Sequence, residues 1–494
     1  MTLILKREPN LAIKHQAFQY QREAVEAIRD LEYSAIFHEQ GLGKTKIAID
    51  LLLYWLENKV IDTVMLVVKK GLVANWVREF KAHSHLTPRL LTADRRSNFY
   101  VLNSPARLIL THYEAVKGER KRLQLFLKTR AVAVILDEAT KIKNPESDLA
   151  QVFFELAPLF KRRVIMTGTP IANRPYDVWA QIKFLDNGKA LGNDFEGFKR
   201  ELDLSNDLGT DKEAQETFEL ALRGLNDKLT AFSVRETKDT GVIELPAKLV
   251  KTIRTDWEPR QFDLYTQVRE STRAIVVQEG LLTEDDAEEA IKRLLRLVQI
   301  ASNPALVDES YTSDPGKWIA LLDLITDITA AGEKCIVWTT FTENADWLAT
   351  RLQEFGVTKV HGKLSMDQRN RAIELFLKDP ECRVLIATPG AAKEGLTLTV
   401  ANHVIFFDRG FSLDDYLQAQ DRIHRVSQVK TCYVYNLIMR DSIDEWVDLL
   451  LQAKKLAAQL AQGDISYDYY KTNMSYSYGE IVRGILDLED KKMP

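Results

Sequence analysis

Short runs of Val, Ile and Leu, each followed by a helical pattern, recur in two separate parts of the chain. Apolar and polar residues alternate little within them, which is typical of parallel strands in a sheet covered by helices on both faces. The first 186 residues contain predicted strands at Ser34–Phe37, Thr63–Val68, Arg107–Leu110, Val132–Leu136 and Arg163–Met166. The pattern returns at Lys334–Thr339, Lys359–His361, Arg383–Thr388, His403–Asp408 and Cys432–Asn436. The sequence therefore predicts an α/β protein with two parallel sheets.

The segment between these two parts has a different character. Charged helical patterns such as Asp211–Leu225 and Thr283–Ile300 dominate it, and few apolar runs in it resemble buried strands. Ser310–Gly316 is rich in turn residues and is predicted to be a linker. We expect a first lobe, helical insertions with the inter-lobe connection, a second lobe and a C-terminal helical extension, at 1–186, 187–314, 315–445 and 446–494.

Composition excludes some classes of protein. Of 494 residues, 45% are hydrophobic and 28% charged, and no apolar run approaches the roughly 18 residues of a membrane span. Met1–Leu5 is too short for the apolar core of a signal peptide, so we expect an intracellular protein. We also expect the protein to be a monomer. Cys335, Cys382 and Cys432 lack metal-site spacing and are predicted to be buried thiols. The net charge of −4 still allows nucleic acid to bind in a basic cleft.

A phosphate-binding loop is the strongest chemical signal. Gly41-Leu42-Gly43-Lys44-Thr45 follows a predicted strand and opens a predicted helix at Lys44–Asn58. Backbone N–H groups in such a turn bind phosphates, the lysine reaches the β- and γ-phosphates, and the threonine hydroxyl ligates Mg²⁺. His38 stands at the first glycine position of the full motif, so the match is incomplete.

Two acidic residues end the predicted strand Val132–Leu136. Asp137 and Glu138 follow the phosphate loop by about 90 residues, and the carboxyl ends of parallel strands meet at one sheet edge. Asp137 is therefore predicted to hold Mg²⁺, and Glu138 to orient and deprotonate the attacking water. An isolated Asp-Glu pair would more often be a solvated strand end.

Two arginines in the second α/β part form the third signal. Arg422 and Arg425 lie three residues apart on a predicted helix and hence on one helical face. They could equally form a solvated salt-bridge surface. Supplied across a cleft to a γ-phosphate, they would be arginine fingers, worth about 10³–10⁵ in rate in other systems.

Taken together, these blocks resemble superfamily-two helicases, and specifically the SWI/SNF family of helicase-like ATPases. The resemblance covers about residues 15–450 and implies two RecA-like lobes that use ATP and Mg²⁺. The blocks are similar, in order, to the Q motif and motifs I, Ia, Ib, II, III, IV, V and VI: Phe18–Gln21, His38–Thr45, Leu66–Phe80, Thr111–Glu114, Asp137–Asn144, Met166–Arg174, Val337–Thr342, Thr388–Leu398 and Gln418–Gln428. Further family marks are Arg235–Lys238 before Leu245-Pro246, and Gln299 before Asn303-Pro304.

The resemblance also assigns roles to individual residues. It implies that Gln21 contacts adenine and that Gly395 of motif V lies at the nucleotide. Motif III and motif VI would couple the nucleotide to movement, through Thr167, Gly168, Thr169 and Gln418. Candidate contacts to DNA phosphates, by motif match, are Lys69, Lys70, Thr111, Thr339, Thr340, His361 and Thr388.

Several positions depart from the family pattern. His38 replaces an aspartate, Lys69 and Lys70 replace Cys-Pro, Thr140 replaces the histidine of motif II, and Ser427 replaces a glycine. None of them removes a phosphate, Mg²⁺ or arginine-finger group. Thr140 does leave open how motif II is coupled to motif III.

The predicted function is an ATP-driven motor that tracks along double-stranded DNA by gripping the backbone without reading sequence. Three alternatives stay open. The motor could separate or anneal strands as a helicase, it could act on RNA, or it could be an ATP-gated binding switch with little turnover. The biological pathway is not legible in the sequence.

Overall fold

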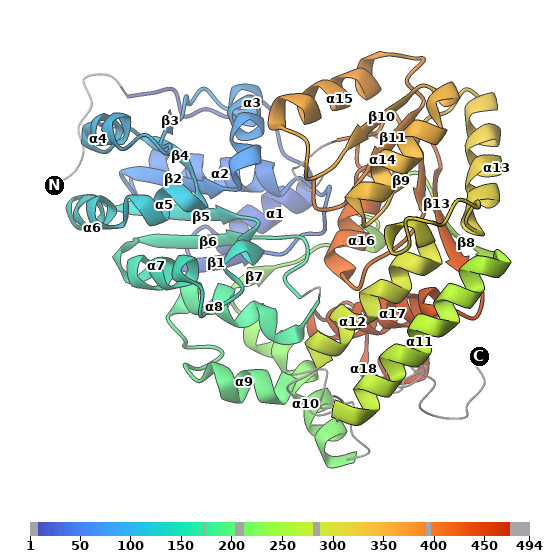
Figure 1. The fold of residues 1–494 in the computed structure, drawn as a ribbon. Coiled ribbons are helices and arrows are strands. Elements are labelled where there is room, and N and C mark those ends of the chain that lie inside the picture. Colours follow the sequence, from blue (N-terminus) through green and yellow to red (C-terminus); the bar gives the residue numbers. More distant parts are fainter. Residues whose placement is uncertain (1–7, 172, 203–211, 280–286, 392–396, 475–494) are drawn as a thin grey trace. The chain divides into compact units, whose positions relative to one another are not determined.

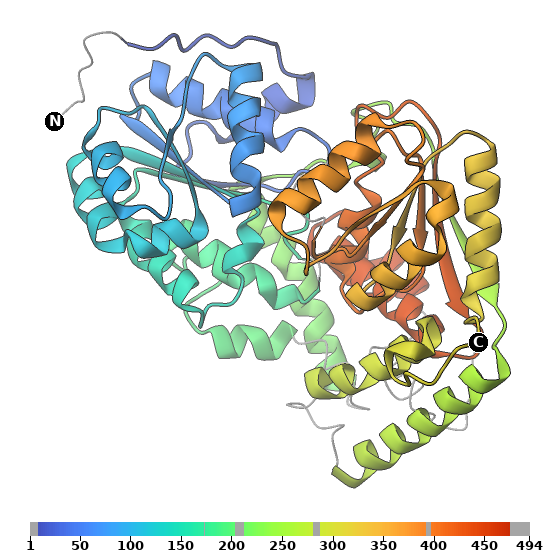
Figure 2. The same ribbon diagram turned by 45° about the horizontal axis from the view of Figure 1, so that its top comes forward.

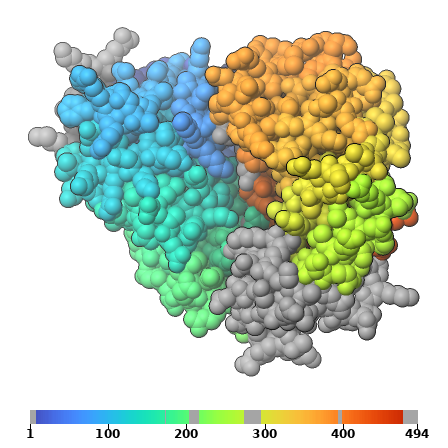
Figure 3. Space-filling model, viewed as in Figure 1, coloured from blue at the N-terminus to red at the C-terminus, as the bar shows by residue number. Residues whose placement is uncertain are grey.

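The structure is a computed structural model, and it describes residues 8–171, 173–202, 212–279, 287–391 and 397–474. The chain divides into two compact units. Unit 1 comprises Met1–Leu202 and Ala221–Ile243, and unit 2 comprises Asp203–Leu220 and Glu244–Pro494. Unit 1 runs from blue to green, and unit 2 is mostly yellow to red, in the ribbon (Figure 1) and as packed atoms (Figure 3).

Unit 1 is built on a seven-stranded parallel sheet in the order β3-β4-β2-β5-β6-β1-β7. Its strands, from β1 to β7, are Tyr33–Ile36, Thr63–Val68, Arg89–Leu90, Leu108–His112, Val132–Asp137, Arg162–Met166 and Ser233–Val234. The central strands are buried along nearly their whole length, as expected for a sheet covered on both faces.

Helices cover both faces of this sheet (Figure 1, Figure 2). Alternate strand residues, such as Val64, Leu66 and Ile135, pack with α1, α2 and α3 in one continuous core. Helices α5 to α8 pack against one another, and α5 and α8 also contact strands. The helices α1 to α9 are Gln19–Ile28, Lys44–Glu57, Val73–His83, Arg95–Asn103, Tyr113–Gly118, Arg120–Thr129, Asp148–Leu156, Trp179–Asp186 and Phe195–Leu202. Helix α10, Lys212–Thr230, contributes residues to both units.

Unit 2 is built on a six-stranded parallel sheet in the order β10-β11-β9-β12-β13-β8. Its strands, from β8 to β13, are Lys248–Thr255, Cys335–Trp338, Val357–Val360, Val384–Ala387, His403–Phe406 and Cys432–Met439. One face packs against α15 and α16, and the other against α13 and α14. The helices α11 to α18 are Pro259–Glu279, Ala287–Ser302, Lys317–Ala330, Thr342–Arg351, Met366–Lys378, Leu413–Gln420, Ile443–Ala461 and Tyr467–Asn473.

The ten predicted strands are all present, and the α/β fold class with two parallel sheets is confirmed. The segment 187–314, predicted to hold helical insertions and the inter-lobe connection, also contains two strands. It contains β7, which extends the sheet of unit 1, and β8, which pairs along its full length with β13 in unit 2. Ser310–Gly316 lies within unit 2, whereas the chain passes between the units at Leu202–Asp203, Leu220–Ala221 and Ile243–Glu244.

The three cysteines are buried, as predicted, in or beside the strands of unit 2. Across the part of the chain that the structure describes, no helix is both long and apolar enough to cross a membrane.

Candidate nucleotide and nucleic-acid sites

The predicted phosphate loop connects β1 to α2. Two of its residues have positive φ angles, Gly41 at 90° and Gly43 at 70°, a conformation that favours glycine. Gly43 caps α2, which begins at Lys44, so the first N–H groups of this helix point into the loop. A Cβ atom at Gly43 would lie 2.3 Å from Nε2 of Gln21. The loop therefore requires glycine for both its backbone angle and its close neighbour.

The side chain of Lys44 is hydrogen-bonded to the backbone of the residues that lead into the loop. Its Nζ donates hydrogen bonds to the carbonyl oxygens of His38, at 2.9 Å, and Glu39, at 3.3 Å. The side chain is buried, and the adjacent Thr45 is partly exposed. An ammonium group, a helix N-terminus and a hydroxyl in one turn fit the phosphates of a nucleoside triphosphate and its Mg²⁺.

Gln21 supports this loop from α1. Its Nε2 and the hydroxyl of Tyr20 both donate to the carbonyl oxygen of Leu42, at 3.2 and 3.0 Å. Gln21 is 4% exposed. The residue predicted to contact adenine is thus also a structural neighbour of the phosphate loop.

Asp137 ends β5, and neighbouring elements hold it. The indole Nε1 of Trp76, from α3, donates to its Oδ2 at 2.7 Å, and the hydroxyl of Tyr113 donates to its backbone carbonyl at 2.8 Å. Burial and the adjacent Glu138 raise the pKa of Asp137 to about 6, whereas Trp76, Lys44 and Lys69 lower it. Among the described residues, no donor bonds its Oδ1. The carboxylate is therefore oriented through one oxygen, and the other can accept a cation.

Glu138 has a left-handed backbone conformation, with φ 54° and ψ 55°, which is uncommon for a side chain of its size. Its Oε1 accepts a hydrogen bond of 3.1 Å from Nε2 of Gln40, in the phosphate loop. Motif III lies on the other side of Gln40. A Cβ atom at Gly168 would come within 2.8 Å of Gln40 Cγ and 3.0 Å of its backbone nitrogen. Motifs I, II and III thus meet at one glutamine.

The segment at β7 is bonded to the chain leading into the phosphate loop. Arg235 donates to the carbonyl oxygen of Phe37 at 2.7 Å, and the backbone nitrogen of Lys238 donates to the carboxylate of Glu39 at 2.8 Å. The neighbouring His38 is 2% exposed, and burial followed by the charge of Lys44 lowers its pKa to about 4. At neutral pH this histidine is uncharged, so it adds no second cation beside Lys44.

The two predicted arginine fingers lie in unit 2, but the helical geometry predicted for them is wrong. Helix α16 ends at Gln420, and both arginines lie in the turn that follows it. Arg422 is buried, and its carbonyl oxygen accepts from the backbone of Leu398. Arg425 donates to the carbonyl oxygen of Asp421 at 2.8 Å and to Oγ1 of Thr397, in motif V, at 2.9 Å.

Gln418 and Gly395 are the two other residues of unit 2 that were predicted to act at the nucleotide or in coupling. Gln418 is buried on α16, where it donates to Asp414 at 2.7 Å. Gly395 lies outside the described residues.

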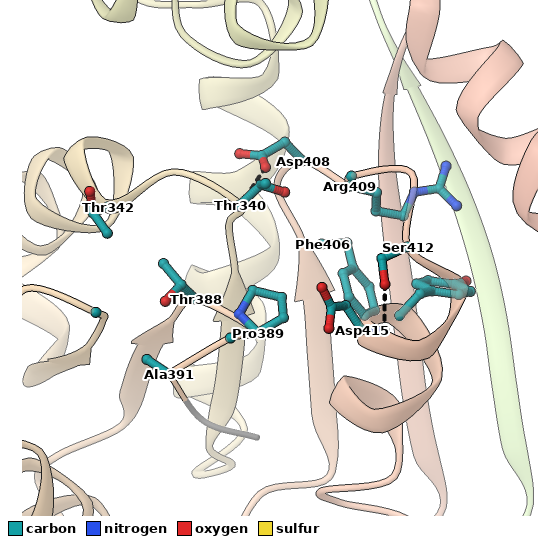
Figure 4. Close-up of a pocket in the computed structure, with 14 residues that line it drawn as sticks. Thr340, Thr342, Thr388, Pro389, Ala391, Phe406, Asp408, Arg409, Ser412 and Asp415 are labelled. Carbon is teal, nitrogen blue, oxygen red and sulfur yellow. Dashed lines mark hydrogen bonds between the residues drawn. The ribbon is translucent and has the colours of Figure 1, made fainter. Parts of the chain in front are cut away.

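A cavity of about 330 Å³ opens at the carboxyl ends of β9, β11 and β12 (Figure 4). Thr340, Thr388 and Gly390 line it, together with the apolar side chains of Phe406 and Tyr416. Thr340 and Thr388 were both predicted to contact phosphates. The structure therefore brings these two together at one opening.

Three other predicted phosphate contacts are used inside their own units. Thr111 is fully buried and donates to the carbonyl oxygen of Leu91. Thr339, also fully buried, donates to Asp408 at 2.6 Å, and His361, 2% exposed, bonds Asp346 at 3.1 Å. The hydroxyl groups of Thr111 and Thr339 thus have internal partners, whereas only Nε2 of His361 does, because its Nδ1 has no hydrogen-bond partner among the described residues.

The two lysines of motif Ia have different surroundings. Lys70 is exposed at the start of the short turn before α3. Lys69 is partly buried, at the end of β2, and lies close enough to Asp137 to lower the pKa of that carboxyl. Lys70 is thus the more available to a DNA backbone, and Lys69 also acts on the predicted metal ligand.

Gln40, Trp76 and Tyr113 lie within the motifs recognised in the sequence, but no role was predicted for any of them. Each forms a contact across 24 to 98 residues of sequence. A motif block shows that such residues are near the site, and only the fold shows which atom each one holds.

Comparison with known proteins gives the family. A model of the SNF2-related domain matches residues 20–306, more than half of the chain, and a model of the helicase conserved C-terminal domain matches residues 316–427. An uncharacterized ATP-dependent helicase of Mycoplasma pneumoniae is 27% identical, over 94% of this chain and 44% of its own length. The ISWI chromatin-remodeling complex ATPase of Saccharomyces cerevisiae is 26% identical, over 83% of this chain and 37% of its own length.

A solved SWI2/SNF2 ATPase core of Sulfolobus solfataricus, in complex with double-stranded DNA, is 25% identical, with 98% of this chain and 99% of that chain covered and a TM-score of 0.43. The chain spans less than half the length of the two curated relatives named above. The match of the domain model to more than half of the sequence shows that the chain belongs to the SNF2-related family.

Proposed function

We propose that the chain hydrolyses ATP and uses the cycle to translocate along double-stranded DNA. The observation that best supports ATP hydrolysis is that three motifs meet in unit 1. Gln40, in the loop of Lys44, contacts both the carboxylate of Glu138, next to Asp137, and the motif III residue Gly168. Membership of the SNF2-related family supports the same reading.

The residues of unit 1 have separate tasks in this proposal. Lys44 exchanges its bonds to loop carbonyls for the β- and γ-phosphates, and Thr45 and Asp137 hold Mg²⁺. Bound Mg²⁺ supplies positive charge that offsets the charge of the phosphates. Glu138 orients the attacking water and accepts its proton. Gln21 contacts the adenine.

Unit 2 contributes the cationic residues Arg422 and Arg425, which we propose as arginine fingers. Arg425 is bonded to Thr397 of motif V, and Thr388, at the other end of that motif, lines the cavity. This arrangement would let a nucleic acid at the cavity affect turnover. Gln418 and Gly395 keep their predicted roles in coupling and at the nucleotide.

For DNA, we propose contacts from Lys69, Lys70, Thr340 and Thr388. Their hydroxyl and ammonium groups suit phosphate oxygens and carry no sequence information. Thr111 and Thr339 are left out because their hydroxyl groups have internal partners, whereas the buried His361 stays a candidate through its Nδ1 atom. Binding that uses the backbone should weaken steeply as salt rises.

The test compares ATP turnover with single-stranded DNA, duplex DNA and RNA, side by side. We expect duplex DNA to stimulate most. Stimulation by RNA alone would contradict the proposal, and tight DNA binding with almost no turnover would indicate a switch.

Translocation is tested with a blunt duplex, a tailed duplex and a triplex, each with ATP. The third strand of the triplex should be displaced, whereas the duplexes should stay paired, since unwinding costs about 1.4 kcal/mol per base-pair step. Separation of the tailed duplex without triplex displacement would favour a helicase.

A further inference from the structure

Gln40 lies where the catalytic glutamate and motif III meet. Its Nε2 donates to Glu138 Oε1 at 3.1 Å, which fixes one end of the Glu138 side chain. Its Cγ and Cδ pack against Gly168 so closely that an added Cβ would come within 2.8 and 3.0 Å of them. Any movement of Gly168 toward the phosphate loop must therefore displace the partly buried Gln40 side chain, because the two already lie at van der Waals contact.

Motif III is itself fixed to the strand that leads into this loop. The backbone nitrogen of Thr167 donates to the carbonyl oxygen of Ile36, the last residue of β1, at 3.2 Å. The hydroxyl of Thr167 accepts from the backbone of Thr169 at 3.2 Å. The turn around Gly168 is thus held at its base and packed at its tip against one side chain.

The sequence leaves the link between motifs II and III open, because Thr140 stands where the family pattern has histidine. In the structure, the side chain of Gln40, from motif I, touches a residue of each of these motifs. We propose that Gln40 is a positioning residue that relays the conformation of motif III to the carboxylate of Glu138, and thereby couples nucleic-acid binding to ATP hydrolysis. This rests on the ATPase proposed above.

The first test replaces Gln40→Met, which keeps the length of the side chain and removes the amide donor. The ratio of DNA-stimulated to basal ATP turnover should fall at least about fivefold. The matched control is Gln124→Met, because Gln124 Nε2 also donates to a glutamate Oε1, that of Glu155, at 2.5 Å in the same unit. The control should keep the wild-type ratio. An unchanged ratio in Gln40→Met would overturn the relay.

The second test needs no DNA. Gly168→Ala adds a Cβ that pushes on the Gln40 side chain, so it should change basal turnover at least about tenfold in the wild-type background. In a Gln40→Ala background the Cγ and Cδ contacts are gone and only the contact with the backbone nitrogen, at 3.0 Å, remains, so the same substitution should change turnover by a smaller factor, about threefold. Equal changes in both backgrounds would overturn the relay while leaving the proposed ATPase in place.

Amide hydrogen exchange gives a readout that does not depend on turnover. In the nucleotide-free protein, Gly168→Ala should alter exchange in the peptide covering Asp137–Ile142 when Gln40 is present, and not in Gln40→Ala. If wild type hydrolyses ATP without DNA stimulation, the DNA half of the proposed function fails. The comparison of Gly168→Ala in the two backgrounds and the hydrogen-exchange measurement then test the relay without DNA. A change in exchange that occurs with or without Gln40 would refute the relay.

Discussion

Two aspartates follow buried strands in the two units, and their sequence contexts are similar. Asp137 comes after Val132–Leu136, and Asp408 after five apolar or imidazole residues at His403–Phe407. Asp137 is partly exposed and receives one side-chain hydrogen bond, from Trp76. Asp408 is 2% exposed and accepts through both oxygens, from Thr339, the Thr340 backbone, Ser302 and Asn344.

The number of donors separates the two roles. A carboxylate that accepts bonds through both oxygens holds neighbouring elements together, whereas one bonded through a single oxygen keeps the other for a cation. Asp408 in this way binds the end of β9 to the end of α12 (Figure 4 shows its bond to Thr340). Asp137 is held on one side only, which orients it and leaves it able to accept Mg²⁺.

The largest effect should come from Asp137→Asn. The amide keeps the size of the side chain but lacks the negative charge, so turnover should fall about a thousandfold, or about 4 kcal/mol. Steady-state ATP hydrolysis at saturating Mg²⁺ measures this, with circular dichroism to confirm folding. A loss below about tenfold would mean that Asp137 is structural, like Asp408.

Asp408→Ala should act on stability. It leaves three buried or partly buried donors without their acceptor, and Asn344 keeps only its bond to Ser302, at a cost of about 3 kcal/mol to the local stability of unit 2. Amide exchange in β9 and β12 should quicken about a hundredfold, while β1 and β5 in unit 1 keep their protection. Equal loss of protection in both units would show that the network does not belong to unit 2 alone.

Trp76→Phe should have a smaller effect, about tenfold on the Mg²⁺ concentration needed for half-maximal turnover. The pKa of Asp137 is raised to about 6, so its carboxyl is protonated, and binds Mg²⁺ poorly, below that pH. The indole bond stabilises the carboxylate, and removing it should move the acid limb of the Mg²⁺ affinity to higher pH. The affinity can be measured by titration with Mn²⁺. If the Mg²⁺ affinity of Trp76→Phe falls at the same pH as that of the wild type, the indole bond is only structural.

The smallest effect should distinguish two adjacent threonines of unit 2. Thr340→Val should weaken duplex DNA binding about threefold, by loss of one phosphate contact, without affecting folding. Thr339→Val should instead destabilise unit 2, since its hydroxyl bonds Asp408. Fluorescence anisotropy at several salt concentrations and thermal melting compare the two. Weaker DNA binding in folded Thr339→Val alone would reverse the assignment.

Sequence reasoning succeeds where a pattern has one physical meaning. Uninterrupted apolar runs identified the central strands, and the glycines of the phosphate loop were recognisable because their positive φ angles leave few alternatives. The strand β8 was missed because it is an edge strand. Most of Lys248–Thr255 is exposed, so its polar residues hide the apolar period.

Reasoning from sequence fails where two neighbours share a chemistry. Thr339 and Thr340 both follow the same strand, and only the fold shows that one hydroxyl is turned to Asp408 and the other residue lines the cavity. Arg422 and Arg425 follow a helical spacing, yet α16 ends two residues before the first of them. Spacing alone does not reveal where a helix ends.

The pairing of β8 with β13 determines how this protein can be divided into fragments. A fragment beginning at residue 316, where the helicase C-terminal match starts, would lack β8 and expose eight residues of β13 as an open edge. Such an edge is a template for pairing with other chains. A cut after residue 243 keeps β8 paired with β13. A fragment that begins at residue 244 should therefore aggregate less than one that begins at residue 316.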